Sequence, residues 1–517
     1  MPTNHIPAMA RALFGLLFLI CPHTHDAIPS SQTGTAATGG SEEPSLEVRL
    51  GQVLSAPVLV RSSWGVQVRS MDTGKILFAE NPQKRLIPAS NLKLLTAVAA
   101  VEDLGPDFRF TTRIWTDGRI EDGTLEGNLI IQGGADPTLG ARFYSPDPEK
   151  MEEGDPLAVF RKWVENLRNL GIQRIRGRLL ADDSLLAAEG PGRGWSWDDL
   201  VYGYGAVPSG LQYNEGVALV RVSPAGAGSP AHLLWRPKTP LIRWQNRIRT
   251  GPREELELKW RRREGKVELA GAVEPSQVPV WLSVAVRSPV RYFTSTFAEV
   301  LRSGHLEVMG HREGEDGHGH PGASRTELFS HESPPLSQVL RVFLKISQNL
   351  YGETLVRMLD PASSGKRGEA GLMRMESILV HRAGLEPDSF LLADGSGLSR
   401  HNLISAGAVM RLLEYAHRQS YGTAFQQWLP AAGTDGTLRR RMTAPGLKGR
   451  IQAKTGSMEG VRALSGFVET VHGETLAFAL LVNSLKGDES DLKALQEEFL
   501  QVLVNAPGTG TPPSPPQ

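Results

Sequence analysis

The chain has almost no cysteine, since Cys21 is the only one among its 517 residues. One thiol excludes a disulfide framework and any Cys-rich metal site. Of its thirteen histidines, four lie in a Gly-rich polar stretch: His305, His311, His318 and His320. No cysteine or carboxylate geometry there selects a metal, so we interpret the stretch as an exposed loop and expect neither a metal nor a cofactor.

The chain also lacks a net charge, because 56 Lys and Arg residues balance 56 Asp and Glu residues. No overall field therefore favours nucleic acid or an anionic lipid surface, and we expect no nucleic-acid partner. Hydrophobic residues make up 40% and charged residues 22%, which is ordinary for a globular protein. The length exceeds that of one compact core and predicts two or three domains.

The apolar run near the N-terminus, residues 12–20, is too short to span a bilayer as a helix. Because Arg11 precedes it, we interpret the run as an export signal, with a buried helix as the alternative. A lipid anchor on Cys21 fits poorly with the bulky Ile20 before it. Signal and flexible lead-in are expected to fill residues 1–45 of an exported, periplasmic or extracytoplasmic protein. An exported protein of this kind can also associate peripherally with a membrane, and the sequence does not define the oligomeric state.

Three short motifs occur in the order used by serine acyl-transfer enzymes that lack a catalytic histidine. They are Ser90-Asn91-Leu92-Lys93, Ser347-Gln348-Asn349 and Lys454-Thr455-Gly456. Two further S-x-x-K sequences begin at Ser363 and Ser490. Ser363 has no apolar helix after it, and Ser490 is more simply an N-cap residue of the last helix. Ser90 instead falls at the first turn of a strongly apolar helix, so we select it as the nucleophile.

Periodicity predicts a β-rich region inserted into a domain of helices and strands. Residues 64–69 and 76–79 alternate as a hairpin. Helical patterns cover residues 92–100, 157–170, 336–358, 372–382, 406–418 and 492–503, and later strands cover 450–454, 463–470 and 476–483. We therefore expect one antiparallel sheet built from both chain ends and covered by helices. The expected domains are a catalytic domain at 46–109 and 290–505, an insertion of two β-rich domains at 110–289, and a disordered tail at 506–517.

The motif residues have the chemistry that acyl transfer needs. A serine hydroxyl is a poor nucleophile without a base, and on a helix Ser90 and Lys93 share a face. Lysine normally has a pKa of about 10.4, so burial and a second cation, Lys454, are needed to lower the pKa of Lys93. The Ser347 hydroxyl is suited to relay a proton and the Asn349 amide to hold a substrate carbonyl.

The last motif is expected to bind substrate. Lys454 and the Thr455 hydroxyl suit an anionic carboxylate, and Gly456 permits close approach of a ligand backbone. The Ser457 N–H, together with those at the start of the Ser90 helix, completes an expected oxyanion hole. A structural alternative exists for each of the two later motifs: a pair of polar helix residues, and a strand end followed by a turn.

With these motifs placed, residues 50–505 resemble the class C low-molecular-mass penicillin-binding proteins, the D-alanyl-D-alanine carboxypeptidase/endopeptidases of peptidase family S13. The gap of 257 residues (347 − 90) between the first two motifs matches that family's habit of inserting domains there. Further similar stretches lie at residues 127–129, 133–139, 181–184, 195–200, 394–400 and 433–438. Gln348, where Asp or Asn is common, and Ser457-Met458, which replaces Thr-Leu, are modest departures.

The resemblance implies a β-lactamase/transpeptidase-like α-β-α sandwich, an α+β fold within the broad α/β class. It implies that peptidoglycan stem peptides ending in D-Ala-D-Ala acylate Ser90, with Lys93 as base, and that β-lactams do the same. Ser347 and Lys454 would shuttle protons, while Asn349 and Thr455 would bind substrate. Two alternatives stay open at this point: a β-lactamase or esterase on the same fold, and a non-catalytic cell-wall scaffold.

Overall fold

The computed structural model describes residues 44–186, 190–261, 266–309, 325–360, 367–486 and 489–508. The expected export signal, most of the histidine-containing stretch and most of the expected tail lie outside these residues. No helix in the described part of the chain is long and apolar enough to cross a membrane.

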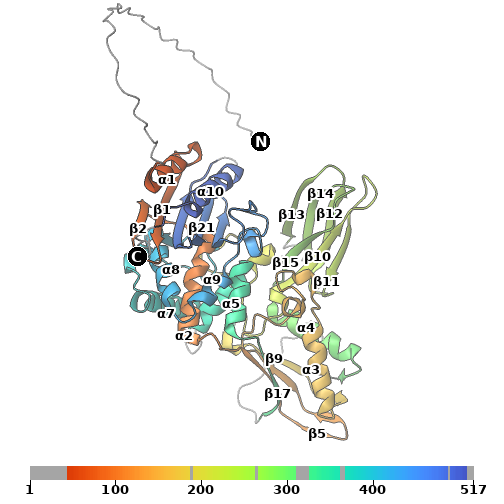
Figure 1. The fold of residues 1–517 in the computed structure, drawn as a ribbon. Coiled ribbons are helices and arrows are strands. Elements are labelled where there is room, and N and C mark those ends of the chain that lie inside the picture. Colours follow the sequence, from red (N-terminus) through yellow and green to blue (C-terminus); the bar gives the residue numbers. More distant parts are fainter. Residues whose placement is uncertain are drawn as a thin grey trace, which may run out of the picture. The chain divides into compact units, whose positions relative to one another are not determined.

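Strands from the two ends of the chain form one antiparallel sheet in the order β2-β1-β22-β21-β20. The strands are β1 (Ser63–Ser70), β2 (Ile76–Glu80), β20 (Ile451–Met458), β21 (Val461–Glu469) and β22 (Thr475–Asn483). Figure 1 shows the red N-terminal and blue C-terminal strands side by side. The sheet expected from the sequence is therefore confirmed.

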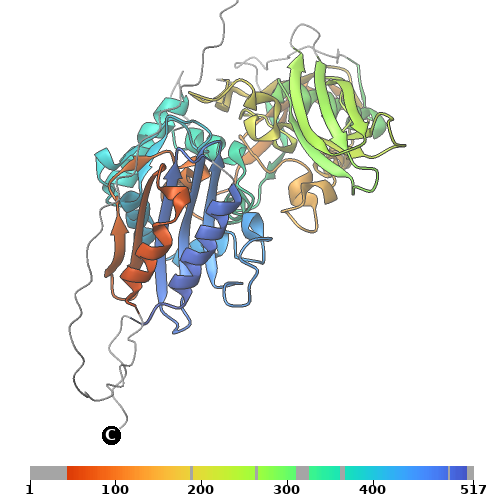
Figure 2. The same ribbon diagram turned by 90° about the horizontal axis from the view of Figure 1, so that it is seen from above.

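Helices cover both faces of this sheet (Figure 2). On one face lie α1 (Leu46–Leu54) and α10 (Glu489–Val504), and on the other α8 (Ala406–Arg418) packs on β1 and β22. Alternate residues of β22 enter different hydrophobic cores: Phe478 and Leu480 face the core of α1 and α10, whereas Ala479 and Leu481 face the core of α8. Because successive strand residues point to opposite faces, this alternation establishes the α-β-α layering.

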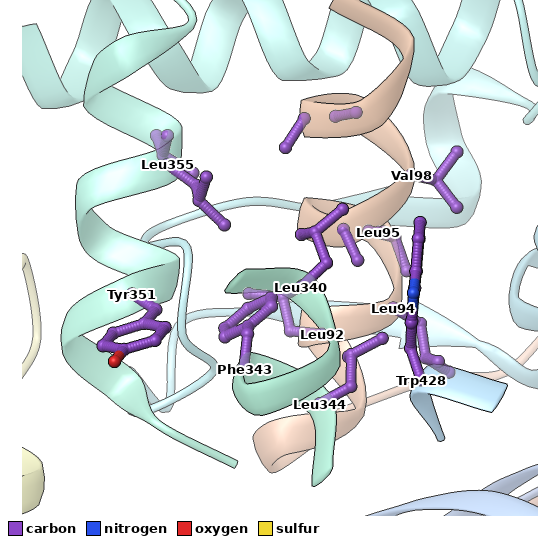
Figure 3. Packing of buried hydrophobic residues seen from close by; sticks show 14 of the residues in the cluster. Leu92, Leu94, Leu95, Val98, Leu340, Phe343, Leu344, Tyr351, Leu355 and Trp428 are labelled. Carbon is purple, nitrogen blue, oxygen red and sulfur yellow. The ribbon is translucent and has the colours of Figure 1, made fainter. Parts of the chain in front are cut away.

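The helical layer that carries the first motif is centred on α2 (Lys93–Leu104). Leu94, Leu95 and Val98 are fully buried, and each contributes about 1.5–3 kcal/mol through its burial. Figure 3 shows them packed against side chains of the neighbouring helices. The labelled neighbours belong to α5 (Leu336–Lys345), α6 (Asn349–Met358) and α9 (Gly422–Trp428), and α7 (Arg367–His381) also packs on α2. The Ser90 turn is therefore held in place by the hydrophobic packing of the helix that follows it.

The single helix predicted over residues 336–358 is wrong, because the chain breaks between α5 and α6. Ser347 adopts the left-handed conformation (φ 62°), and the Gln348 N–H donates to the Phe343 carbonyl at 3.2 Å. This is the Schellman bond that ends many helices, with serine where glycine is usual. The Gln348 side chain then caps α6 by accepting from the Leu350 N–H at 3.1 Å. Ser347 and Asn349 therefore lie at a joint between helices.

Where the structure describes it, the inserted region contains several small sheets, two α-helices and a number of short 3₁₀ turns. Its elements are β4 (Thr111–Thr116), β5 (Arg119–Glu121), β6 (Thr124–Glu126), β7 (Leu129–Gln132), α3 (Ala158–Asn169), β8 (Arg174–Ile175), β9 (Leu179–Asp182), β10 (Val217–Ser223), β11 (His232–Arg236), β12 (Arg243–Thr250), β13 (Glu254–Arg261), β14 (Lys266–Val273), β15 (Val280–Ala285), α4 (Pro289–Ser303), β16 (Glu307–Val308) and β17 (Thr326–Glu332). The sheet orders are β11-β10-β15, β12-β14-β13, β16-β8-β6-β5 and β17-β4-β7-β9. A last small sheet joins β3 (Arg85–Leu86), β18 (Phe390–Leu391) and β19 (Leu403–Ser405).

The segment after residue 289 was expected to return at once to the catalytic domain, but its contacts differ from that expectation. Helix α4 packs on α3, β16 pairs with β8, and β17 pairs with β4. These pairings join residues 289–332 to the inserted region, so the chain re-enters the helical layer only at α5. A periodic helix pattern could not reveal this junction, since α4 is amphipathic like the helices that follow.

Candidate active site

The first motif brings Ser90 and Lys93 together at the start of α2. Ser90 lies in the 3₁₀ turn Ala89–Leu92, half-buried, and Lys93 is the first residue of the helix. The Lys93 Nζ lies 2.9 Å from the Ser90 Oγ. The expected pairing of the two side chains across one turn is therefore present.

Lys93 has three oxygen neighbours and is fully buried. Besides Ser90, its Nζ donates to Asn349 Oδ1 at 2.7 Å and to the Ser396 carbonyl at 2.5 Å. A neutral amine has two hydrogens and one lone pair. Because two acceptors take the hydrogens, the lone pair is left for the hydroxyl proton of Ser90.

Burial lowers the pKa of Lys93 from 10.5 to about 7, because desolvation disfavours the charged amine. Nearby Asp394 and Glu353 oppose this shift but are outweighed. A pKa near 7 leaves a substantial fraction of the amine neutral at physiological pH, which a general base requires.

The Ser396 carbonyl that contacts Lys93 is held by buried groups. The Glu353 carboxylate accepts from the N–H groups of Gly395 and Ser396, each at 3.0 Å, and pairs with Arg357 at 3.0 Å. Asp394 accepts from the Gly397 N–H and, at 2.9 Å, from the Trp195 indole of the inserted region. This loop therefore presents its carbonyl to Lys93 in a fixed position.

The second and third motifs meet through Ser347 and Lys454. The Lys454 Nζ donates to Ser347 Oγ at 2.8 Å and to the Thr455 carbonyl at 2.8 Å. Desolvation, followed by the positive charge of Lys93, lowers the pKa of Lys454 well below its ordinary value. The charge of Lys93 therefore contributes to the lowered pKa of Lys454, second to burial, whereas the lowered pKa of Lys93 is caused by burial and not by Lys454 as the sequence predicted.

Asn349 links the first two motifs and also contacts the inserted region. Its side-chain oxygen accepts from Lys93, while its Nδ2 donates to the Tyr204 carbonyl at 2.9 Å. Asn349 is buried, and Tyr204 is exposed beside it. The amide that was expected to hold a substrate carbonyl therefore already has partners on both of its polar atoms.

The remaining residues of the third motif lie along β20, an edge strand of the sheet. The Thr455 hydroxyl lies 2.8 Å from that of Thr437, and Ser457 is exposed. A Cβ on Gly456 would lie 2.5 Å from the Pro88 carbonyl. Gly456 thus allows the chain just before Ser90 to lie close to β20, in addition to leaving room for a ligand.

Some groups around the site were not selected from sequence. Ser396, Asp394 and Thr437 lie in stretches noted only for their resemblance, and Glu353 was not noted. A signal for Glu353 existed: it lies four residues after Asn349 on the same helix face, with Arg357 four residues further on. A charged pair on an apolar helix face often marks a buried polar network.

A protein-family model and individual relatives all place the chain in the same family. The model of the D-Ala-D-Ala carboxypeptidase 3 (S13) family matches residues 46–505. A D-alanyl-D-alanine carboxypeptidase of Actinomadura sp. (strain R39) is 31% identical over 87% of this chain and 83% of its own. The D-alanyl-D-alanine carboxypeptidase DacB of Haemophilus influenzae is 26% identical over 86% of this chain and 90% of its own.

A solved structure agrees with these sequence relatives. The crystal structure of penicillin-binding protein 4 (DacB) from Haemophilus influenzae superposes with a TM-score of 0.70 at 25% identity. The match covers 88% of this chain and 98% of that one. A second structure of the Haemophilus protein, complexed with a β-lactam, has a TM-score of 0.65 at 24% identity, covering 87% and 98% of the two chains.

Proposed function

The chain belongs to the D-Ala-D-Ala carboxypeptidase 3 (S13) family and is a serine-type D-Ala-D-Ala carboxypeptidase, and we propose that Ser90 is its nucleophile. The observation that supports this assignment is the contact of the Ser90 hydroxyl with Lys93, a buried lysine whose pKa is lowered to about 7. A hydroxyl beside a neutral amine has the base that acylation needs.

Acylation then begins with proton transfer from Ser90 Oγ to Lys93 Nζ as Oγ attacks the carbonyl carbon between the two D-Ala residues. The negative charge formed on the carbonyl oxygen is stabilised by backbone N–H groups of Ser90 and Ser457. When the C–N bond breaks, the leaving amine takes a proton that Lys454 delivers through Ser347, and D-Ala departs. The proton held by Lys93 replaces the one that Lys454 has given up. Water then attacks the ester on Ser90: its OH becomes part of the new carboxyl group of the stem peptide, and its other proton returns to Ser90 Oγ.

Substrate is bound by groups that surround this centre. Asn349 positions the peptide through the second hydrogen of its Nδ2, since Tyr204 accepts only one of the two. Lys454 and Thr455 bind the terminal carboxylate, and Gly456 leaves room along β20. The Thr437 hydroxyl, 2.8 Å from that of Thr455, adds a second donor for the carboxylate. The same groups bind peptidoglycan stem peptides and β-lactams, and the β-lactams acylate Ser90. The peptide crosslinks of peptidoglycan are a further proposed substrate.

The test measures D-Ala release from a diacetylated Lys-D-Ala-D-Ala peptide, together with the site of labelling by a tagged penicillin. We expect D-Ala release and a covalent adduct on the peptide that contains Ser90. An adduct that turns over rapidly without D-Ala release would indicate a β-lactamase instead. A folded wild-type chain that forms no adduct would indicate a non-catalytic scaffold.

The rate of acylation is expected to rise with pH and to level off above about pH 8. The reason is that only neutral Lys93 accepts the serine proton, and its pKa of about 7 makes the neutral form dominant over this range. Acylation rates measured with a tagged penicillin from pH 5 to pH 9 test this, with the unfolding temperature recorded at each pH as the control. A flat profile over that range would contradict the role of Lys93 as base.

We further propose that the protein acts outside the cytoplasm, because its substrate is part of the cell wall. The N-terminal export signal expected from the sequence supports this location. Detection of the mature N-terminus after secretion tests it.

A further inference from the structure

A buried ion pair in the inserted region contacts the middle residue of the second motif. Arg142 donates through Nε and Nη2 to the two carboxylate oxygens of Glu215, the Nη2 bond being 2.9 Å. The Arg142 side chain is 10% exposed and that of Glu215 is 4% exposed. Gln348 Nε2 donates to Glu215 Oε2 at 2.5 Å, and the Tyr351 hydroxyl donates to Oε1 at 3.0 Å.

The four donors fill the hydrogen-bonding capacity of the Glu215 carboxylate. Figure 3 shows the Tyr351 ring among the hydrophobic side chains and its hydroxyl oxygen pointing away from them. Glu215 itself is held in an unusual backbone conformation, since Asn214 and Glu215 are both left-handed (φ 50° and 55°). Asn214 is fixed in turn, because its Oδ1 accepts from the Ala141 N–H and its Nδ2 donates to the Val217 carbonyl. Residues rarely adopt such a conformation unless their surroundings impose it.

Gln348 has a polar contact at each end of its amide. Its Oε1 accepts from the Leu350 N–H and thereby caps α6, while its Nε2 binds Glu215. An amide can accept at one end and donate at the other, whereas an ionised carboxylate of the same shape can only accept. Its neighbours in the chain are Ser347, which contacts Lys454, and Asn349, which contacts Lys93.

We propose that the Arg142–Glu215 pair is a positioning device that acts through Gln348 to hold Ser347 and Asn349 against the two lysines. This inference rests on the proposed roles of those residues. Arg142, Glu215 and Gln348 do not touch the reacting atoms, so they are positioning residues. The inserted region therefore affects the acylation rate through the buried contact of Glu215 with Gln348. Gln348, an apparent departure from the family pattern, supplies the N–H donor for one oxygen of Glu215.

The experiment exchanges the amide donor at residue 348 and the carboxylate acceptor at residue 215. Gln348→Glu retains the shape and the α6 cap but brings a second carboxylate against Glu215. We expect acylation by a tagged penicillin at pH 7.5 to slow by about 10- to 100-fold, because small displacements of catalytic groups have effects of this size. Combining it with Glu215→Gln leaves one carboxylate and one amide at this contact, which removes the like-charge repulsion although Arg142 loses one acceptor. Part of the acylation rate should therefore return.

A matched control separates positioning from loss of stability. Asp182→Asn weakens the Arg325–Asp182 ion pair (3.1 Å), which is also in the inserted region and largely buried. We expect this variant to lower the unfolding temperature without changing the acylation rate. If Gln348→Glu does not fold, Gln348→Met, which removes both polar contacts at similar length, takes its place and should be slow as well.

Each result has a distinct meaning. Wild-type acylation by Gln348→Glu or Gln348→Met would overturn the positioning role, and so would a double variant as slow as Gln348→Glu. A wild-type chain that forms no adduct at Ser90 would instead overturn the proposed function on which the inference rests. Slow acylation by Gln348→Glu that the second substitution rescues would support the inference, since a general loss of packing is not repaired by a second buried change.

Discussion

Ser90→Ala is expected to abolish the covalent adduct with penicillin and to lower D-Ala release by about 10³-fold or more, because no other group can form the acyl-enzyme. The half-buried Ser90 side chain makes one hydrogen bond, to Lys93. The unfolding temperature should therefore change by only a few degrees. Intact-protein mass spectrometry after incubation with penicillin detects the adduct directly.

Ser490→Ala is the matched control, since Ser490 also begins an S-x-x-K sequence. Ser490 lies in the first turn of α10, on the opposite face of the sheet from α2 and the Ser90 turn. Its replacement should leave both the adduct and D-Ala release at the wild-type level. An adduct that persists in Ser90→Ala would refute the assignment of the nucleophile.

Lys93→Met is expected to slow acylation by about 10²- to 10⁴-fold, the range that general bases contribute. Methionine has nearly the length of lysine but no basic nitrogen, so Ser90 keeps its place and loses its proton acceptor. Stopped-flow measurement of acylation gives the rate, and the pH dependence expected for the wild type should disappear in this variant. A variant that acylates at the wild-type rate would exclude Lys93 as the base.

The same substitution should stabilise the fold near neutral pH. Between about pH 7 and 10.5 the unfolded chain binds a proton on Lys93 that the folded chain does not hold, so burial of Lys93 disfavours folding. The cost is on the order of 4 kcal/mol at pH 7 and vanishes as the pH rises through 10.5. Lost hydrogen bonds to Asn349 and Ser396 offset part of the gain. Urea midpoints of both proteins at pH 7 and pH 10 test this, and the difference should shrink at the higher pH.

Much of the fold and of the site follows from the sequence. Helices α8 and α10 show the spacing of apolar residues that indicates a buried face. Helix α2 and the last strand, β22, are instead nearly continuous apolar runs, which indicate elements buried on all sides. Ser90 and Lys93 could be paired because residues three positions apart on a helix lie on the same face. Lys454 could be placed near them only by analogy with other proteins, since nothing local in the chain brings it there.

The features that could not be predicted depend on tertiary contacts. Ser347 ends α5 without the glycine that marks most such ends, so the break was hidden in a continuous apolar pattern. Glu215 and Arg142 are far from Gln348 in the chain, and no periodicity connects them. The pairing of β17 with β4 joins residues more than 200 positions apart, and no local pattern in the sequence indicates it.

The sheet built from both chain ends also has a consequence for biosynthesis. Strand β1 pairs with β22, so Ser63 meets Asn483 only after a further 420 residues (483 − 63) have been made. Contacts this distant in sequence form slowly, because a long loop must close before they are gained. Lys454 reaches Ser347 by the same late assembly. A growing chain that has not yet reached β20 therefore lacks the lysine that contacts Ser347, so the three motifs cannot meet before that strand is made.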